Sequence, residues 1–172
     1  MPSGYEVTSV SGVAAPATTW GLGSGWTADP APCATLADPA GGHTESAQGV
    51  SGSGTGGIVY AIVAQLPAPR PDPAVLAGCP GWTVINGRAR SDVRLTDPPH
   101  IDGAETVAMA SDTTTSAEGG RRIESHAETF IAYLGEYCAF TTLVTDPGSA
   151  HSPLPPQFAA DLLVKTVSAL RG

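Results

Sequence analysis

The sequence predicts an α+β fold, in which an antiparallel β-sheet carries a C-terminal amphipathic helix on one face and long Gly/Pro-rich loops join the strands. Three observations predict this fold class. Short apolar runs rich in β-branched residues alternate with turn residues. Two of these runs flank a Gly-Glu pair that can form a tight turn. The C-terminal segment repeats its apolar residues at helical spacing.

The first part of the chain is expected to contain one strand and a long irregular region. Residues 5–10 alternate weakly between polar and apolar side chains, which is typical of a strand at a sheet edge. Residues 11–56 are expected to be loop-rich and in places mobile, apart from a short helix at 32–36. We expect a single domain over residues 1–172, because no change in composition marks a boundary.

The middle of the chain is expected to contain further strands. Residues 58–64 form a continuous apolar run, which is typical of a central strand covered on both faces. A short helix is expected at 72–77, with Asp72 as its N-cap and Pro73 at the first helical position. The remaining strands of this region are expected at 82–85, 93–96 and 105–111.

The clearest local pattern predicts a β-hairpin. Two strand-like runs, 123–134 and 137–145, flank Gly135-Glu136, and a two-residue loop that begins with Gly fits a type II′ turn. Both faces of this hairpin are apolar near the turn, so we expect both to be covered. The turn also sets the register, and the expected pairs are Leu134–Tyr137, Tyr133–Cys138, Ala132–Ala139, Ile131–Phe140 and Phe130–Thr141.

The last expected element is an amphipathic helix over residues 156–170, which we expect to pack across the sheet. Asp161 and Lys165 lie on its polar face with the spacing of an i,i+4 ion pair. Its apolar side chains form one stripe, which consists of Ala159, Leu163, Val167 and Leu170, widened by Phe158 and Leu162.

The charge balance excludes several classes of partner. The formal net charge is −8, Lys165 is the only lysine, and the arginines are scattered. Nucleic acid is therefore not expected as a partner, because binding a phosphate backbone needs clustered basic residues. An anionic membrane surface is disfavoured for the same reason. No run approaches the roughly 20 apolar residues that a membrane-spanning helix needs.

Three cysteines and the N-terminal residues bear on the cellular compartment. The simplest arithmetic pairs Cys33 with Cys79 in a disulfide and leaves Cys138, inside an apolar run, as a buried thiol. The alternative is three unpaired thiols in a reducing cytosol. The first residues have neither a charged nor an apolar leader region, so the chain is either cytosolic or the mature part of an exported protein.

The sequence contains no recognisable catalytic or cofactor motif. Residues 52–57 match G-x-G-x-x-G, but these glycines precede a strand, whereas a dinucleotide site needs a strand before them and a helix after them. We therefore interpret them as a flexible loop. Ser24 lies one position too late for a G-x-S-x-G nucleophile motif. No cofactor is expected, because the glycine motif lies in the wrong context. No metal is expected either, since no two cysteines have the spacing of zinc ligands.

One group of residues deserves testing for chemistry. Glu124, His126 and Glu128 alternate along a strand and therefore share one face. Two carboxylates beside an imidazole can bind a metal or perform acid–base catalysis. The simpler interpretation, which we favour, is the solvated face of the outer hairpin, with Ile123 and Ala127 pointing inward.

Aromatic and basic residues supply candidate ligand contacts. Arginine beside an aromatic ring can hold a carboxylate or a sugar, although aromatic residues in loops more often cap the core. The candidate ligand-binding residues are Trp20, Trp26, Trp82, Arg88 and Tyr133.

Several segments together resemble a known family. They are residues 57–64 (GIVYAIVA), 78–82 (GCPGW), 127–137 (AETFIAYLGEY), 144–148 (VTDPG) and 159–171 (AADLLVKTVSALR). The chain resembles a mycobacterial domain family of unknown function that occurs in secreted proteins and lipoproteins. That family is distantly similar to the extracellular sensor domain of a mycobacterial Ser/Thr receptor kinase. These motifs are structural rather than catalytic.

The resemblance implies a location, a disulfide and a type of surface. It implies export to an oxidising compartment and, in many relatives, a lipidated cysteine just upstream of the mature domain. Cys33 and Cys79 fit the family's paired positions, whereas Cys138 is additional. The resemblance also implies an antiparallel sheet with helices and a groove for a small ligand. No catalytic residue is transferred by it.

Three hypotheses about function follow. The leading one is a secreted or envelope-anchored ligand-binding or sensor-like module, whose partner is a lipid, a glycan or an envelope protein. The second is a structural or protein-interaction domain of the cell envelope. The third is a hydrolase with an unrecognised site, for which Glu124, His126 and Glu128 are the local candidates. The absence of catalytic motifs favours a protein that is not an enzyme.

Overall fold

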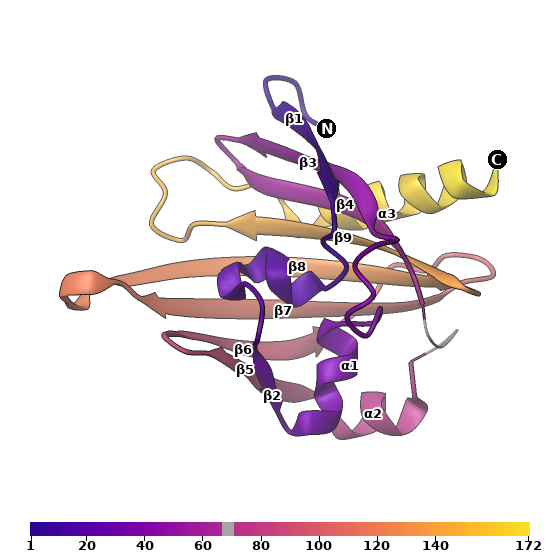
Figure 1. The fold of residues 1–172 in the computed structure, drawn as a ribbon. Coiled ribbons are helices and arrows are strands. Elements are labelled where there is room, and N and C mark those ends of the chain that lie inside the picture. The colour runs from indigo at the N-terminus through magenta and orange to yellow at the C-terminus, as the bar shows by residue number, and fades with distance from the viewer. Residues whose placement is uncertain (67–70) are drawn as a thin grey trace.

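The computed structural model describes residues 1–66 and 71–172, and in these ranges nine strands form one antiparallel sheet (Figure 1). Across the sheet the strands follow the order β1-β3-β4-β9-β8-β7-β6-β5-β2. The predicted α+β fold class is therefore confirmed. The strands are β1 (Glu6–Ser11), β2 (Thr27–Asp29), β3 (Gln48–Gly54), β4 (Gly57–Gln65), β5 (Gly81–Asn86), β6 (Ala89–Thr96), β7 (Glu105–Ser116), β8 (Arg122–Leu134) and β9 (Tyr137–Thr145).

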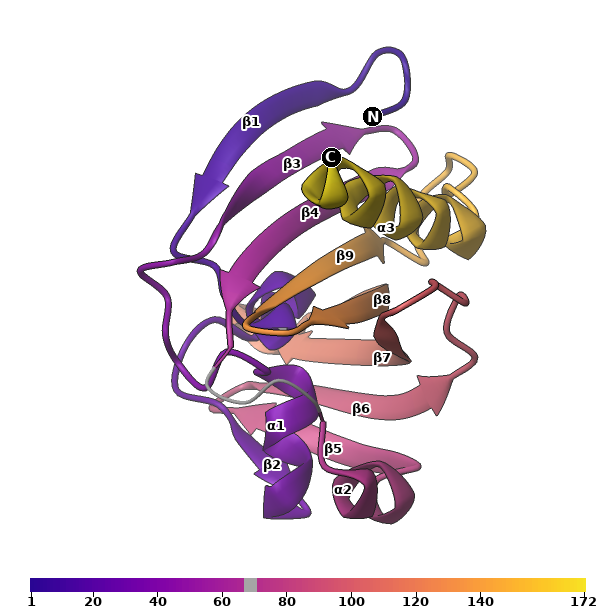
Figure 2. The ribbon, with the colours of Figure 1, turned by 90° about the vertical axis from the view of Figure 1, so that its right-hand side faces the viewer.

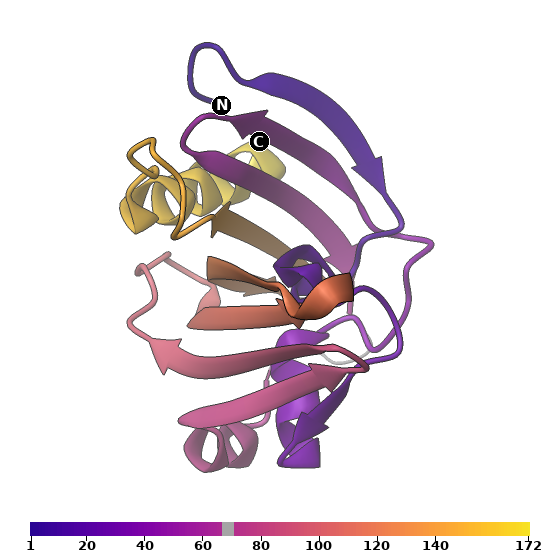
Figure 3. The same cartoon turned by 90° about the vertical axis from the view of Figure 1, so that its left-hand side faces the viewer.

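Helical segments cover both faces of this sheet. The C-terminal helix α3 contacts β4, β8 and β9, whereas the η1 turn contacts β6 to β9. Figures 2 and 3 show α3 and η1 on opposite sides of the strands. None of the helices in the described ranges combines the length and the hydropathy of a membrane span. The helical segments are η1 (Thr18–Leu22), η2 (Ala31–Cys33), α1 (Ala34–Ala37), α2 (Pro73–Gly78), η3 (Glu118–Gly120) and α3 (Pro156–Arg171).

The alternation of side chains along β8 explains why two hydrophobic cores form, one on each face. Ile131 and Tyr133 point to the first core, which includes Trp20 of η1. Phe130 and Ala132 point to the second core, which includes Leu163 of α3. A strand covered on both faces must be apolar at successive positions, as the run before Gly135 is.

The predicted hairpin is confirmed with its register. All five expected pairs are formed between β8 and β9. Gly135 has a φ of 71°, and no residue other than glycine has a positive φ in the described ranges. A positive φ at the first loop position alone is the signature of a type II′ turn.

The C-terminal helix is confirmed, but its apolar stripe ends earlier than predicted. Leu163 and Val167 are at most 1% exposed, whereas Leu170 is 49% exposed. The last turn of α3 points to the same end of the molecule as the β8–β9 turn (Figure 1). The i,i+4 ion pair is absent from the described residues, because Asp161 instead accepts a hydrogen bond from Gln157.

The glycine-rich segment is a strand and a turn rather than a flexible loop, so that expectation was wrong. Gly52 and Gly54 belong to β3, which pairs with both β1 and β4. A Cβ atom on Gly54 would lie 2.4 Å from the ring of Tyr5. Glycine is therefore required here because an aromatic ring packs against the backbone.

The disulfide and the short helices agree with the sequence. Cys33 and Cys79 are bonded, and Cys138 is a buried free thiol. The side chain of Asp72 accepts a hydrogen bond from the backbone N–H of Ala74, as an N-cap residue should. The disulfide joins the end of η2 to the end of α2, and Leu36 of α1 packs into the first core.

Candidate functional site

Two adjoining cavities lie where the β8–β9 turn, the loop before β7 and the C-terminal end of α3 meet. They share Gly103. We call them the apolar groove and the polar cavity. The apolar groove, of about 520 Å³, is lined by Val63, Gly103, Leu134, Tyr137, Leu170 and Arg171. The polar cavity, of about 690 Å³, is lined by His100, Ile101, Asp102, Gly103, Ala104, Glu105, Tyr133 and Gly135.

The apolar groove exists because a helix and a hairpin end at the same place. Val63 of β4 and Leu134 of β8 are half-buried, and both pack against the second core. Tyr137 and Leu170 are each 49% exposed. Arg171 donates a hydrogen bond to the carbonyl of Asp102, which joins the last turn of α3 to the loop before β7. These contacts hold an exposed apolar surface in a defined shape.

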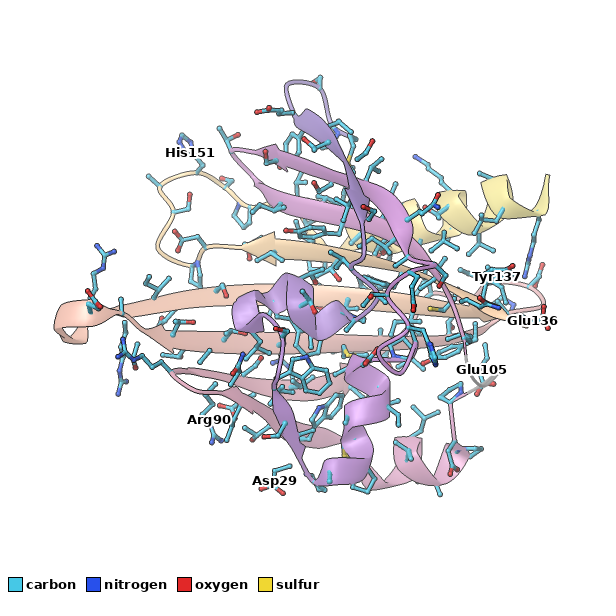
Figure 4. The ribbon with its side chains drawn as sticks, viewed as in Figure 1. Asp29, Arg90, Glu105, Glu136, Tyr137 and His151 are labelled. Atoms are coloured by element: carbon cyan, nitrogen blue, oxygen red, sulfur yellow. A yellow bond between two sulfur atoms is a disulfide. The ribbon has the colours of Figure 1, made fainter. Side chains whose placement is uncertain are left out.

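The polar cavity combines carboxylate acceptors with a tyrosine hydroxyl that can donate. Glu105, Glu136 and Tyr137 lie together at this end of the molecule (Figure 4). Tyr133 is 5% exposed and lines this cavity, and its hydroxyl forms no hydrogen bond with another described residue. Burial raises the pKa of Tyr133, so this hydroxyl stays protonated and can donate.

The five predicted ligand-binding residues are not brought together. Trp20 and Trp82 are buried in the first core, at 1% and 5% exposure, and Trp26 packs half-buried against it. Arg88 lies exposed in the turn between β5 and β6, away from both cavities. Of the five, Tyr133 lines the polar cavity.

Sequence reasoning missed Tyr137, Leu170 and Arg171 as possible contacts. The nearest signal was the apolar stripe of the C-terminal helix, which extends beyond the residues that the sheet can cover.

The buried indole of Trp20 has a structural role. Its Nε1 donates to Oγ1 of Thr129 at 3.0 Å, and that hydroxyl lies 3.0 Å from Oγ1 of Thr142. This chain satisfies three polar groups inside the first core and orients η1 on the sheet.

Two of the three alternating residues of β8 belong to an ion-pair network on the α3 side of the sheet. His126 Nδ1 lies 2.7 Å from Asp112 of β7, and its Nε2 lies 3.0 Å from Glu128. Arg94 of β6 donates to Asp112 at 3.1 Å. Asp112 was missed because its position opposite His126 depends on the β7–β8 register. Glu124 lies further out and lines a different cavity.

The charges in this network support each other. The hydrogen bond to Glu128 is the main cause that raises the pKa of His126, and Asp112 adds to it against the effect of burial. Burial alone would raise the pKa of Asp112, but His126 and Arg94 outweigh it and lower that pKa. The imidazolium form is therefore favoured between the two carboxylates.

The same geometry limits the chemistry of His126. Both ring nitrogens lie against carboxylates, so neither is positioned to deprotonate a hydroxyl or thiol nucleophile. Within residues 1–66 and 71–172, no group of three His, Cys, Asp or Glu side chains is arranged to hold a metal ion.

Ile123, which we expected to point inward, is 49% exposed, whereas Ala127 is buried. The network connects β6, β7 and β8 across their exposed face.

Comparison with known proteins identifies the family. The chain has a structural counterpart in an uncharacterised protein from Mycobacterium smegmatis, the Rv0999 ortholog, with a TM-score of 0.65. The two are 20% identical, and the similarity covers 100% of this chain and 92% of the other, which shows a shared fold. No curated protein matches the sequence. The sequence model of a domain of unknown function, DUF5642, matches residues 1–171, and the chain therefore belongs to this family.

Proposed function

We propose that this protein is an extracytoplasmic, sensor-like module of the cell envelope that binds the apolar part of an amphiphilic molecule in the groove beside α3. The observation that carries the proposal is the apolar groove itself. Its volume of about 520 Å³ lies within the roughly 300–1,000 Å³ that is usual for small-molecule sites.

The exposed side chains of the groove support binding rather than packing. Leu170 and Tyr137 come from different elements, are both half-exposed, and line the same cavity. Single exposed apolar residues are common on protein surfaces, whereas apolar residues gathered around a cavity mark a binding surface. The half-buried Val63 and Leu134 extend this surface inward.

The disulfide and the resemblance to exported domains support the location. Disulfides persist in oxidising compartments and are rare in the cytosol, and Cys33 is bonded to Cys79. The sensor-like role rests on the family resemblance to an extracellular receptor-kinase domain. An envelope location would give the groove access to lipids and lipid-linked glycans.

The proposal is tested with a neutral probe, 1-lauroylglycerol, titrated calorimetrically below its critical micelle concentration. Leu170→Gln should weaken binding about tenfold, because it removes an apolar side chain that the ligand would cover, a loss of about 1.4 kcal/mol. The matched control is Ile85→Gln on β5, because Ile85 is similarly exposed, at 41%, but lies outside the groove. Absence of binding by the unmodified protein, or equal weakening in both variants, would contradict the proposal.

A further inference from the structure

We infer that the polar end of the ligand is an uncharged polyhydroxyl group, such as a sugar ring, which occupies the polar cavity while the apolar chain lies in the groove. This inference rests on the proposed function, since it describes the other half of the same ligand. The linings of the two cavities share Gly103. The groove lies on the side of the second core and Tyr133 on the side of the first, so a ligand that occupies both passes around the end of the sheet near the β8–β9 turn.

The charges around the two cavities disfavour an anionic head group. Asp102 and Glu105 line the polar cavity, and Glu136 lies beside them at this end of the molecule (Figure 4). Among the described lining residues the basic groups are the guanidinium of Arg171 and the imidazole of His100, which lies 2.9 Å from Asp102. Arg171 already donates to the carbonyl of Asp102. A phosphate or carboxylate in the polar cavity would therefore lie among negative charges. The guanidinium of Arg171, already hydrogen-bonded to Asp102, would offset them only in part.

The hydrogen-bonding groups of the polar cavity suit hydroxyl groups. A carboxylate accepts hydrogen bonds, and a buried tyrosine hydroxyl can donate one. Glu105 of β7 and Tyr133 of β8 are directly paired across the two strands, so an acceptor and a donor lie next to each other. A sugar hydroxyl both donates and accepts, and it can satisfy the two together. The Tyr133 hydroxyl lines the cavity, forms no hydrogen bond within the described part of the chain, and can donate to such a sugar hydroxyl.

Tyr137 supports a ring-shaped head group. Its side chain lines the groove, is half-exposed, and lies near Glu136 of the turn and Glu105 of β7 (Figure 4). An aromatic face can pack against the C–H face of a sugar while the hydroxyl groups point to acceptors. The carboxylates that line the site belong to the polar cavity and not to the groove, which suits hydroxyl groups in the former and an alkyl chain in the latter.

The test compares three ligands that share a dodecyl chain and differ only in the head group. Dodecyl β-D-glucoside, dodecyl phosphate and dodecanol are titrated into the full chain below their critical micelle concentrations. We expect the glucoside to bind at least tenfold more tightly than the phosphate and about fivefold more tightly than dodecanol. Equal or tighter binding of the phosphate would overturn the inference, as would equal binding of the glucoside and dodecanol.

Two variants locate the head group. Tyr133→Phe should weaken binding of the glucoside about fivefold and leave binding of dodecanol unchanged. Glu105→Gln should reduce the difference in affinity between the glucoside and the phosphate. Glu124→Gln is the control, because Glu124 is also on β8 but lines another cavity. Circular dichroism checks that each variant is folded. An unchanged preference in both variants would overturn the inference.

The failure of this inference can be told apart from failure of the proposed function. If the phosphate binds best and Leu170→Gln still weakens binding of dodecanol, the proposed binding in the groove is supported and the head-group assignment is wrong. If no dodecyl ligand binds, or Leu170→Gln changes the affinity for none of them, both the proposed function and the head-group assignment are wrong.

Discussion

The imidazole of His126 lies between the carboxylates of Asp112 and Glu128, and the strength of these interactions depends on pH. The side chain of His126 is 28% exposed and that of Glu128 is 15% exposed, so the contact between them is partly shielded from water. Asp112 is 60% exposed, and its contribution is correspondingly screened. A histidine whose pKa is raised by folding stabilises the folded state most below its unfolded pKa, near 6.5. This stabilisation is lost as pH rises through the folded pKa.

The pH dependence gives a prediction for His126→Gln. At pH 5.5 the variant should lose about 1 kcal/mol of unfolding free energy, because hydrogen bonds between charged groups are removed. At pH 9 the loss should be smaller, since the imidazole is then neutral. The pKa of Asp112 is lowered, so its own contribution is lost only as pH falls through that lowered pKa, below both test conditions.

Urea unfolding at the two pH values measures this difference. The control is His100→Gln, because His100 is almost fully exposed and, among the described residues, forms its ion pair with the equally exposed Asp102. A loss for His126→Gln that is the same at pH 5.5 and pH 9 would contradict a charged imidazole in the network.

Among the elements, α3 combines two roles along its length. Its middle covers the sheet, where Leu163 is fully buried and Thr141 of β9 donates to the carbonyl of Ala159 at 2.7 Å. Its last turn extends past this cover and forms one wall of the groove. Variants in the middle should therefore change stability, whereas variants in the last turn should change binding.

A pair of neighbouring residues tests the packing of α3. Leu163→Ala should lower the unfolding free energy by about 2–4 kcal/mol, because a fully buried leucine leaves a cavity when it is truncated. Val164→Ala should change it by less than about 0.5 kcal/mol, because Val164 is 38% exposed. Chemical denaturation measures both, and similar losses in the two variants would show that the helix face is assigned incorrectly.

The β8–β9 hairpin shows how far local signals extend. Its turn type, register and two apolar faces were all predicted, because they depend on residues close together in the chain. The partner of β8 on its other side, β7, pairs over twelve positions that no local pattern could align. The Asp112–His126 contact was missed for this reason.

On the scale of the whole molecule, the disulfide ties the N-terminal segment to the far end of the sheet. Cys33 and Cys79 are 46 residues apart, and they connect η2 to α2 beside β2 and β5. The segment between them includes β3 and β4, so the bond restricts a large part of the unfolded chain. Cys138 belongs to the first core, and burial raises its pKa to about 12.

Replacing both bonded cysteines should be costly. The Cys33→Ser/Cys79→Ser double variant should lose about 4 kcal/mol of unfolding free energy on a chain-entropy model. Thiol titration of the unmodified protein should detect no reactive thiol in the native state and one, from Cys138, after denaturation. The control, Cys138→Ala, should keep the sensitivity of its stability to reductant. Three reactive thiols after denaturation without reductant would contradict the disulfide.

The sequence alone predicted seven of the nine strands, the hairpin and the terminal helix, because periodicities of 2 and 3.6 and turn residues act over a few positions. It also indicated the Cys33–Cys79 pair. It missed β2 and β3, which lie in the Gly-rich region that was expected to be loop. Only the tertiary structure decided the strand order, the burial of Trp20 and Trp82, and the groove between Leu170 and Tyr137. Each of these features brings together elements that are far apart in the sequence. Their placement depends on how the two cores pack on opposite faces of one sheet, and no local pattern specifies that packing.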